Sequence, residues 1–226
     1  MAEVYPLDVG FSNCNVIKGE GAIQVGGGAP GKKREFIRAM EAIPIDPQEI
    51  SLIVVTHAHF DHYYSASDFQ ELTGAPIAIH RLDKESIERG SKLIPGGLSL
   101  WGDLVSASLR LLSPLLRMKS LDVDVIIGDK GMSLREYGVP GRVIHTLGHT
   151  EGSVSVLLDS GEAFVGDISM NRLPLRLSPG LPILGYDLER VKDSWRTLLG
   201  EGAETVYPGH GKPFPAQVIR EALGEG

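Results

Sequence analysis

The chain has 226 residues and a formal net charge of -7 at pH 7, with 42% hydrophobic and 23% charged residues. This length allows a substantial core, and the acidic balance argues against a nucleic-acid-binding surface. A single cysteine, Cys14, excludes an internal disulfide and fits a reducing compartment.

The first quarter of the chain predicts an antiparallel sheet followed by a helix. Extended runs over residues 3–9, 13–19 and 22–31 alternate with glycine turns. The first run lacks the basic region and long apolar core of a signal peptide, so we expect a cytoplasmic protein. Residues 32–43 space apolar side chains at helical intervals, and Pro44 ends this predicted helix.

The middle of the chain predicts a buried strand, a short helix and a helical insertion. The strand covers residues 52–55, the helix residues 65–74, and a second strand residues 76–80. Residues 82–120 form the predicted insertion, which Pro114 kinks or divides. Charged residues interrupt its most apolar part, residues 98–118, so it does not predict a membrane span. The insertion could form a lid over an apolar substrate, a homodimer face, or a helix pair packed on the sheet.

The rest of the chain alternates strands with glycine turns and ends in helices. Asp187 is the expected N-cap of the helix predicted near residues 186–200. Strands are expected at residues 122–129, 142–146, 153–159 and 163–167. A last strand that runs into a loop is expected over residues 204–211, and helices at residues 186–200 and 215–223. No low-complexity tract or linker divides the chain, so we expect one domain over residues 1–226 in an α+β arrangement.

The stretch THAHFDH follows the buried strand directly and concentrates metal-binding groups. His57 and His59 can point to the same side because they are two residues apart. Asp61 and His62 need a turn, which aims them at a neighbouring point. Without a cation, imidazoles and carboxylates at this density would desolvate one another. The stretch therefore predicts a metal site and suits two ions better than one.

Three further candidates follow later predicted strands. His149 lies in a glycine-flanked loop after residues 142–146, Asp167 ends the strand at residues 163–167, and His210 follows the last strand. His80 and His145 fall outside this set, and we expect structural or supporting roles for them.

In their order along the chain, these motifs (His-x-His-x-Asp-His, Gly-His-Thr, Gly-Asp and Pro-Gly-His-Gly) resemble those of the metallo-β-lactamase-fold hydrolase superfamily. The resemblance covers about residues 3–215. It implies a four-layer αββα sandwich with metals at one edge between the two sheets. It also implies a first metal site of His57, His59 and His149, a second of Asp61, His62 and His210, and Asp167 bridging both.

Such a site predicts a hydrolase with two divalent ions, zinc before iron or manganese. A bridging hydroxide would be the nucleophile, Asp61 would orient it, and the residual positive charge would favour an anionic tetrahedral intermediate. The substrate would be a small ester, thioester or lactone, with no nucleic-acid or membrane partner. A persulfide dioxygenase with one iron is the alternative from another class.

The chain departs from the usual motifs beside the metals. Tyr63 and Tyr64 replace a common glycine pair, where they could narrow the site, contact substrate or pack under the sheet edge. Residues 24–31, QVGGGAPG, replace the usual Asp-Thr-Gly. These changes affect the subfamily rather than the ligands.

The metal motifs resemble those of glyoxalase II-like thioesterases, although the chain ends soon after His210, without their C-terminal helical region that binds glutathione. A quorum-quenching lactonase is another alternative, but Met170 stands where such enzymes typically carry a tyrosine. Arg172 and Arg176 could meet a substrate carboxylate, and Tyr186 could lie on the same rim.

Overall fold

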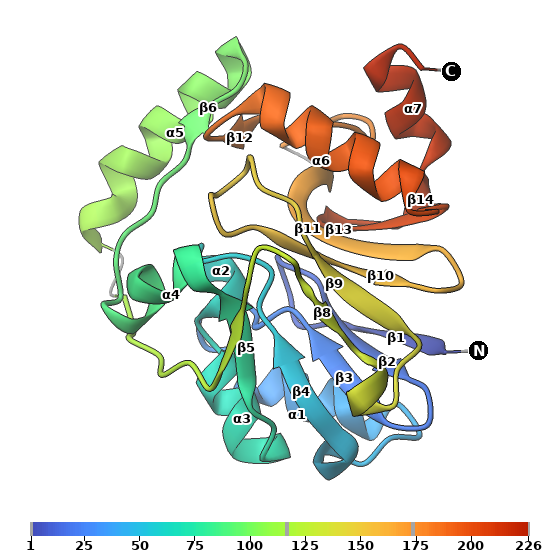
Figure 1. The fold of residues 1–226 in the computed structure, drawn as a ribbon. Coiled ribbons are helices and arrows are strands. Elements are labelled where there is room, and N and C mark those ends of the chain that lie inside the picture. Colours follow the sequence, from blue (N-terminus) through green and yellow to red (C-terminus); the bar gives the residue numbers. More distant parts are fainter. Residues whose placement is uncertain (1, 116–117, 173–174, 226) are drawn as a thin grey trace.

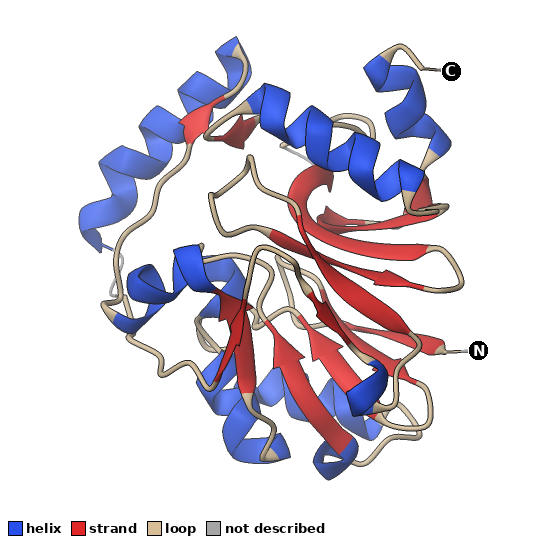
Figure 2. Ribbon diagram, viewed as in Figure 1, coloured by secondary structure: helices blue, strands red, loops and turns tan. Residues whose placement is uncertain are grey.

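The computed structural model describes residues 2–115, 118–172 and 175–225. Figures 1 and 2 show two β-sheets face to face, with helices covering the outer face of each. The four-layer αββα sandwich predicted from the resemblance is therefore confirmed.

The first sheet carries the loop that begins the histidine cluster. Its strand order is β1-β2-β3-β4-β5-β7, where β1 is Glu3–Leu7, β2 Cys14–Lys18, β3 Ala22–Val25, β4 Ile50–Val54, β5 Ile77–His80 and β7 Val125–Ile127. The first three strands form the predicted antiparallel meander, whereas β3, β4, β5 and β7 are mutually parallel. Because parallel strands end at one edge, the segments that follow β4 and β5 lie side by side.

The second sheet supplies the remaining candidate ligands. Its order is β14-β13-β11-β10-β9-β8, where β8 is Met132–Ser133, β9 Gly141–His145, β10 Val154–Leu158, β11 Glu162–Asn171, β13 Thr205–Gly211 and β14 Phe214–Pro215. The long strands β11 and β13 are parallel, and the other neighbours are antiparallel.

Three apolar layers hold these sheets and helices together. Phe36 of α1 (Lys33–Glu41) stacks on Phe69 of α3 (Ala66–Thr73) outside the first sheet. Between the sheets, side chains such as Leu52 and Val156 interdigitate. Trp195 of α6 (Leu188–Gly200) packs outside the second sheet with α7 (Gln217–Leu223). The predicted N-cap is confirmed, since the Asp187 carboxylate accepts the Arg190 N–H.

The insertion is only partly helical, which corrects the prediction for residues 82–120. Helix α4 (Arg81–Glu88) and helix α5 (Leu100–Leu112) are separated by an extended segment that contains β6 (Gly96–Gly97). Pro95 and the two glycines disfavour helix, and β6 instead pairs with β12 (Leu184–Gly185). Pro114 lies in a 3-10 turn that follows α5, so it ends the helix rather than dividing it.

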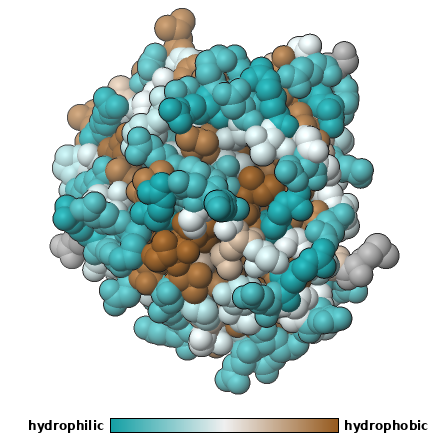
Figure 3. Space-filling model, in the orientation of Figure 1, coloured by the Kyte–Doolittle hydropathy of each residue, from teal (hydrophilic) through white to brown (hydrophobic). Residues whose placement is uncertain are grey.

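Helix α5 stands at the upper left of Figure 1, joined to the second half of the chain by the β6–β12 ribbon. Its inner face buries Gly102 and Ser106, whereas Leu100 and Leu111 on its outer face are 90% and 80% exposed. Figure 3 shows hydrophobic surface in this region. The homodimer through residues 98–118 stays a prediction. No helix in the described ranges is long and apolar enough to cross a membrane.

Candidate metal centre

The candidate ligands converge at one edge of the sandwich, between the two sheets. The segment after β4 carries His57 and His59, and the helical turn α2 (Phe60–Tyr63) then carries Asp61 and His62. From the other sheet, His149 comes from the turn between β9 and β10. Asp167 and His210 come from β11 and β13.

Asp167 and His210 lie inside strands rather than at strand ends or in loops, which corrects the sequence prediction. Strands β11 and β13 continue past both residues because Met170 pairs with His210 and Asn171 with Gly211. The register shifts on both sides of Gly166, whose φ is +52°. Such a bulge re-aims the following side chain, and here that side chain is Asp167.

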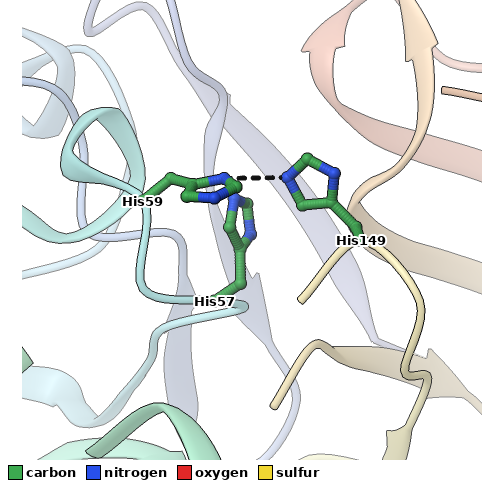
Figure 4. A group of neighbouring side chains, drawn as sticks. All are labelled: His57, His59 and His149. Atoms are coloured by element: carbon green, nitrogen blue, oxygen red, sulfur yellow. Dashed lines mark hydrogen bonds between the residues drawn. The ribbon is translucent and has the colours of Figure 1, made fainter. Parts of the chain in front are cut away.

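His57, His59 and His149 form the first group of donors (Figure 4). One nitrogen from each ring lies within 4.8 Å of the others. His149 Nε2 is 2.8 Å from His59 Nδ1, and all three residues are buried. This is the set that the resemblance implied for the first metal.

Asp61, His62 and His210 form the second group, again with donor atoms within 4.8 Å of one another. The two Nε2 atoms of His62 and His210 are 3.1 Å apart, and Asp61 Oδ2 is 3.2 Å from His210 Nε2. Asp167 lies between the two groups. Its carboxylate is 3.3 Å from the Nε2 atoms of both His62 and His210, and 3.7 Å from His149 Nε2.

The outer hydrogen bonds of the rings direct lone pairs into the cluster. His149 Nδ1 donates to the Leu184 carbonyl at 2.9 Å, and His210 Nδ1 donates to the Phe11 carbonyl at 3.0 Å. In the neutral rings, each Nε2 is therefore an acceptor. Within the described residues, His57 Nε2 and His59 Nε2 are buried without any hydrogen-bond partner. Buried ring nitrogens without a partner, beside a convergent group of other donors, fit divalent cations, and the donor set suits zinc.

Burial and charge set the protonation of the cluster. Burial lowers the pKa of His59 to about 3, and it lowers the pKa of His57 and His149 as well. His210 differs, because the carboxylates of Asp167 and Asp61 outweigh burial and raise its pKa well above 6.5. Burial alone would raise the pKa of Asp61, but the neighbouring His62 and His210 lower it to about 2. Most of the cluster is thus already in its ligand form at neutral pH.

These shifts predict that acid destabilises the metal-depleted protein. Burial shifts proton uptake by these three imidazoles to a lower pH in the folded chain than in the unfolded chain. Their contribution to stability is therefore complete above pH 6.5 and declines as the pH falls below it. The raised pKa of His210 makes its contribution to stability larger as the pH falls, but it is a single group against three with lowered pKa values. We expect the melting temperature of chelator-treated protein to fall between pH 7 and about pH 5. A melting temperature that stays constant or rises over this range, measured by calorimetry, would contradict this account of the cluster.

Asp83 supports the candidate site and was not found from the sequence. It lies on α4, is only 3% exposed, and joins the two halves of the first donor group. Its Oδ2 accepts the Ala58 N–H and the Thr150 hydroxyl, each at 2.8 Å, and its Oδ1 accepts the Gly152 N–H at 3.1 Å. Ala58 stands between two candidate ligands and Thr150 follows a third, so this carboxylate positions both metal-binding segments.

A loop near the N-terminus supports the second donor group and was also missed. The Asn13 amide donates to the carbonyls of Pro208 and Gly211 on either side of His210, at 2.8 and 2.6 Å. Ser12 donates to the Asp61 carbonyl. These contacts join residues about fifty to two hundred positions apart, so no local pattern reveals them.

Two glycines allow the backbone to approach the cluster. A Cβ on Gly209 would lie 2.1 Å from Asp167 Oδ1, and one on Gly27 would lie 2.8 Å from the His62 carbonyl. Gly27 N–H donates to that same carbonyl. The segment that replaces the usual Asp-Thr-Gly therefore still supports a ligand, through its backbone.

A cavity of about 360 Å³ opens beside the cluster. Candidate ligands line it, namely His59, Asp61, His149, Asp167 and His210. Leu93, Ile94, Pro95, Val105 and Leu109 of the insertion form one wall. A larger groove of about 660 Å³ lies elsewhere and contains none of the candidate ligands. The chemistry of the donors identifies the smaller cavity as the site.

The structure does not place the two tyrosines in this cavity. Tyr63 is 1% exposed, packs in the core of the first sheet, and its hydroxyl donates to the Lys119 carbonyl at 3.1 Å. Tyr64 follows α2 and is absent from the cavity lining. The reason is helical geometry: successive residues point about 100° apart, so when His62 faces the cluster Tyr63 faces the core.

The other predicted substrate contacts also lie outside the cavity. Arg172 donates to the carbonyls of Gly10 and Phe11, and Arg176 to those of Ser178 and Leu181. Both arginines line the larger groove instead. Tyr186 is 53% exposed and does not belong to the lining.

His80 and His145 stack on each other away from the cluster, with ring centroids 3.9 Å apart. His80 Nε2 is 3.2 Å from Asp129, and His145 Nε2 donates to the Glu151 carbonyl at 2.8 Å. Their place outside the main donor set agrees with the sequence prediction.

Comparison with known proteins shows the family to which the chain belongs. The profile of the metallo-beta-lactamase superfamily matches residues 7–210, and the chain belongs to that superfamily. A probable metallo-hydrolase of Bacillus subtilis, YflN, is 26% identical over 195 residues, which cover 78% of this chain and 70% of the relative. A probable metallo-hydrolase of Methanocaldococcus jannaschii is 25% identical over 212 residues, covering 89% and 88%.

Solved structures show the same fold. The BLEG-1 B3 metallo-beta-lactamase superposes with a TM-score of 0.70 at 19% identity, covering 98% of this chain and 97% of that one. An archaeal superfamily protein from Sulfolobus tokodaii gives a TM-score of 0.65 at 20% identity, covering 99% and 85%. The glyoxalase II-like branch stays a prediction.

Proposed function

We propose that the protein is a hydrolase with two divalent metal ions, zinc by preference, that cleaves the bond between the acyl carbon and the alcohol oxygen or thiol sulfur of a small ester, thioester or lactone. The observation that supports this most strongly is the paired donor set. Three histidines form one group, Asp61, His62 and His210 form the other, and Asp167 lies within 4 Å of both. With Asp167 counted, each ion would have four protein donors, and zinc can take water or substrate as a fifth ligand.

The residues would divide the work as follows. His57, His59 and His149 would hold one ion, Asp61, His62 and His210 the other, and Asp167 would contact both. Bound ions would supply Lewis acidity and lower the pKa of water to near neutrality. Asp61 lines the cavity and stays ionised at neutral pH because its pKa is about 2. It can therefore accept a hydrogen bond from the attacking water and hold it beside the acyl carbon.

Metal analysis together with a substrate panel tests this proposal. We expect two zinc-like ions per chain in protein purified without added metal, and hydrolysis of esters, thioesters or lactones that chelation removes and zinc restores. Phosphoesters and persulfides serve as controls. A single iron per chain with oxygen consumption on a persulfide would overturn the proposal and favour an oxidoreductase.

A further inference from the structure

The cavity beside the donor cluster has apolar walls from two parts of the chain. Leu93, Val105 and Leu109 come from the insertion, and Phe11, Met170 and Leu184 come from segments that border the ligands. Val105 and Leu109 also pack against the small apolar cluster of Met170, Ile183 and Leu184. Polar chemistry in this cavity is therefore confined to the candidate ligands on its floor.

No lysine or arginine lines the cavity in the described parts of the chain. Arg172 follows β11, but its guanidinium stacks over Phe11, 4.8 Å from the ring centroid, and donates to two backbone carbonyls. Arg176 is engaged in the same way with two other carbonyls. A charged acyl group entering the cavity would thus lose its hydration without gaining a partner on the walls.

The insertion holds its wall in place through backbone contacts. The β6–β12 ribbon pairs Gly97 with Leu184, and the Leu98 N–H donates to the Ile183 carbonyl at 2.7 Å. The Ser106 hydroxyl donates to the Pro95 carbonyl at 2.6 Å, which fixes α5 against the extended segment. The wall is therefore preformed, as ligand cavities usually are.

From these walls we infer that the substrate is uncharged and carries an apolar acyl chain, which lies against the inner face of α5 with the carbonyl at the donor cluster. This inference rests on the proposed hydrolytic function and narrows its substrate class. In the reaction, the oxygen of water forms a bond to the acyl carbon, and the bond from that carbon to the alcohol oxygen or thiol sulfur breaks. One proton goes to the leaving group and the other is released as the acid ionises.

A series of neutral esters from acetyl to octanoyl, with one common leaving group, measures the acyl preference. Each methylene buried in the cavity should raise kcat/KM about fourfold until the wall is filled. Hexanoyl should therefore exceed acetyl by on the order of a hundredfold. A succinyl monoester of similar length, which carries a carboxylate, should be a poor substrate.

Two variants of α5 distinguish the effect of the face that lines the cavity from the effect of the outer face of the helix. Val105→Trp fills part of the cavity and should lower the octanoyl-to-acetyl ratio of kcat/KM by at least about tenfold. Leu104→Trp is the matched control, because Leu104 is on the outer face and 58% exposed, so the ratio should not change. Binding of octanamide to the metal-loaded protein, measured by calorimetry, gives a readout apart from turnover. It should show a negative heat-capacity change, and Val105→Trp should weaken it.

The outcomes distinguish this inference from the proposed function. If the metal-loaded protein hydrolyses acetyl or succinyl esters as well as octanoyl esters, the acyl inference is wrong and the hydrolase stands. If no ester, thioester or lactone is hydrolysed, the proposed function fails, and octanamide binding still decides whether the wall receives an apolar chain. Equal effects of the two tryptophan variants would also overturn the inference.

Discussion

Replacing His59 with alanine should abolish hydrolysis while leaving the sandwich folded. His59 is one of three donors in the first group, faces the cavity, and is 5% exposed. Loss of a residue that only supports a ligand typically costs about 10–100-fold, so loss of a ligand should lower kcat/KM by more than about a hundredfold. The fold should persist because His59 lies outside the sheets and the three main apolar layers.

The measurement combines kcat/KM, metal content per chain and circular dichroism. His145→Ala is the matched control, because it removes a histidine outside the main donor set, and it should keep its metal content and most of its activity. If His59→Ala retains activity with a full metal complement, the assignment of the first donor group is wrong.

Replacing Asp83 with asparagine should weaken metal binding although Asp83 contacts no metal. The Asp83 carboxylate accepts three hydrogen bonds, from Ala58, Thr150 and Gly152. The amide of asparagine has only one oxygen, so its NH₂ group would face at least one of these three donors and that hydrogen bond would be lost. The segments that carry the first group would then lose their common support. We expect zinc affinity to fall by about 10–100-fold, with a smaller loss of kcat at saturating zinc.

A competition titration against a chromophoric chelator measures this affinity. Glu85→Gln is the control, since it removes a carboxylate from the same helix where the side chain is 70% exposed. Unchanged zinc affinity in Asp83→Asn would show that the two segments hold their positions without the carboxylate.

The candidate ligands could be predicted from the sequence because their signal is local. His57, His59, Asp61 and His62 lie within six positions directly after a run of apolar residues, and three other motifs follow predicted strands. The fold followed from the order of those motifs. The lengths of β11 and β13 could not be predicted, because pairing between the two strands, which are far apart in sequence, extends both past the ligands.

The supporting residues could not be predicted for a different reason. An aspartate near the start of an amphipathic helix is expected in solvent, yet Asp83 is buried because its partners come from residues 58 and 150–152. Tyr63 and Tyr64 lie outside the cavity lining because the short helical turn α2 directs His62 toward the cluster and Tyr63 into the core. In the insertion, periodicity detected α5 but not the ribbon, which depends on backbone pairing with residues almost ninety positions away.

Leu184 connects the β6–β12 ribbon to the candidate metal centre. Its carbonyl accepts the Nδ1 proton of His149, its side chain lines the cavity, and its backbone pairs with Gly97 of the insertion. Leu184 therefore links the orientation of the candidate ligand His149 to the position of the cavity wall that the insertion forms. Under the proposed function, exchanging α5 should change the acyl preference, provided that the graft keeps residues 96–98. A graft that lost this short pairing should disturb the candidate metal centre together with the acyl preference.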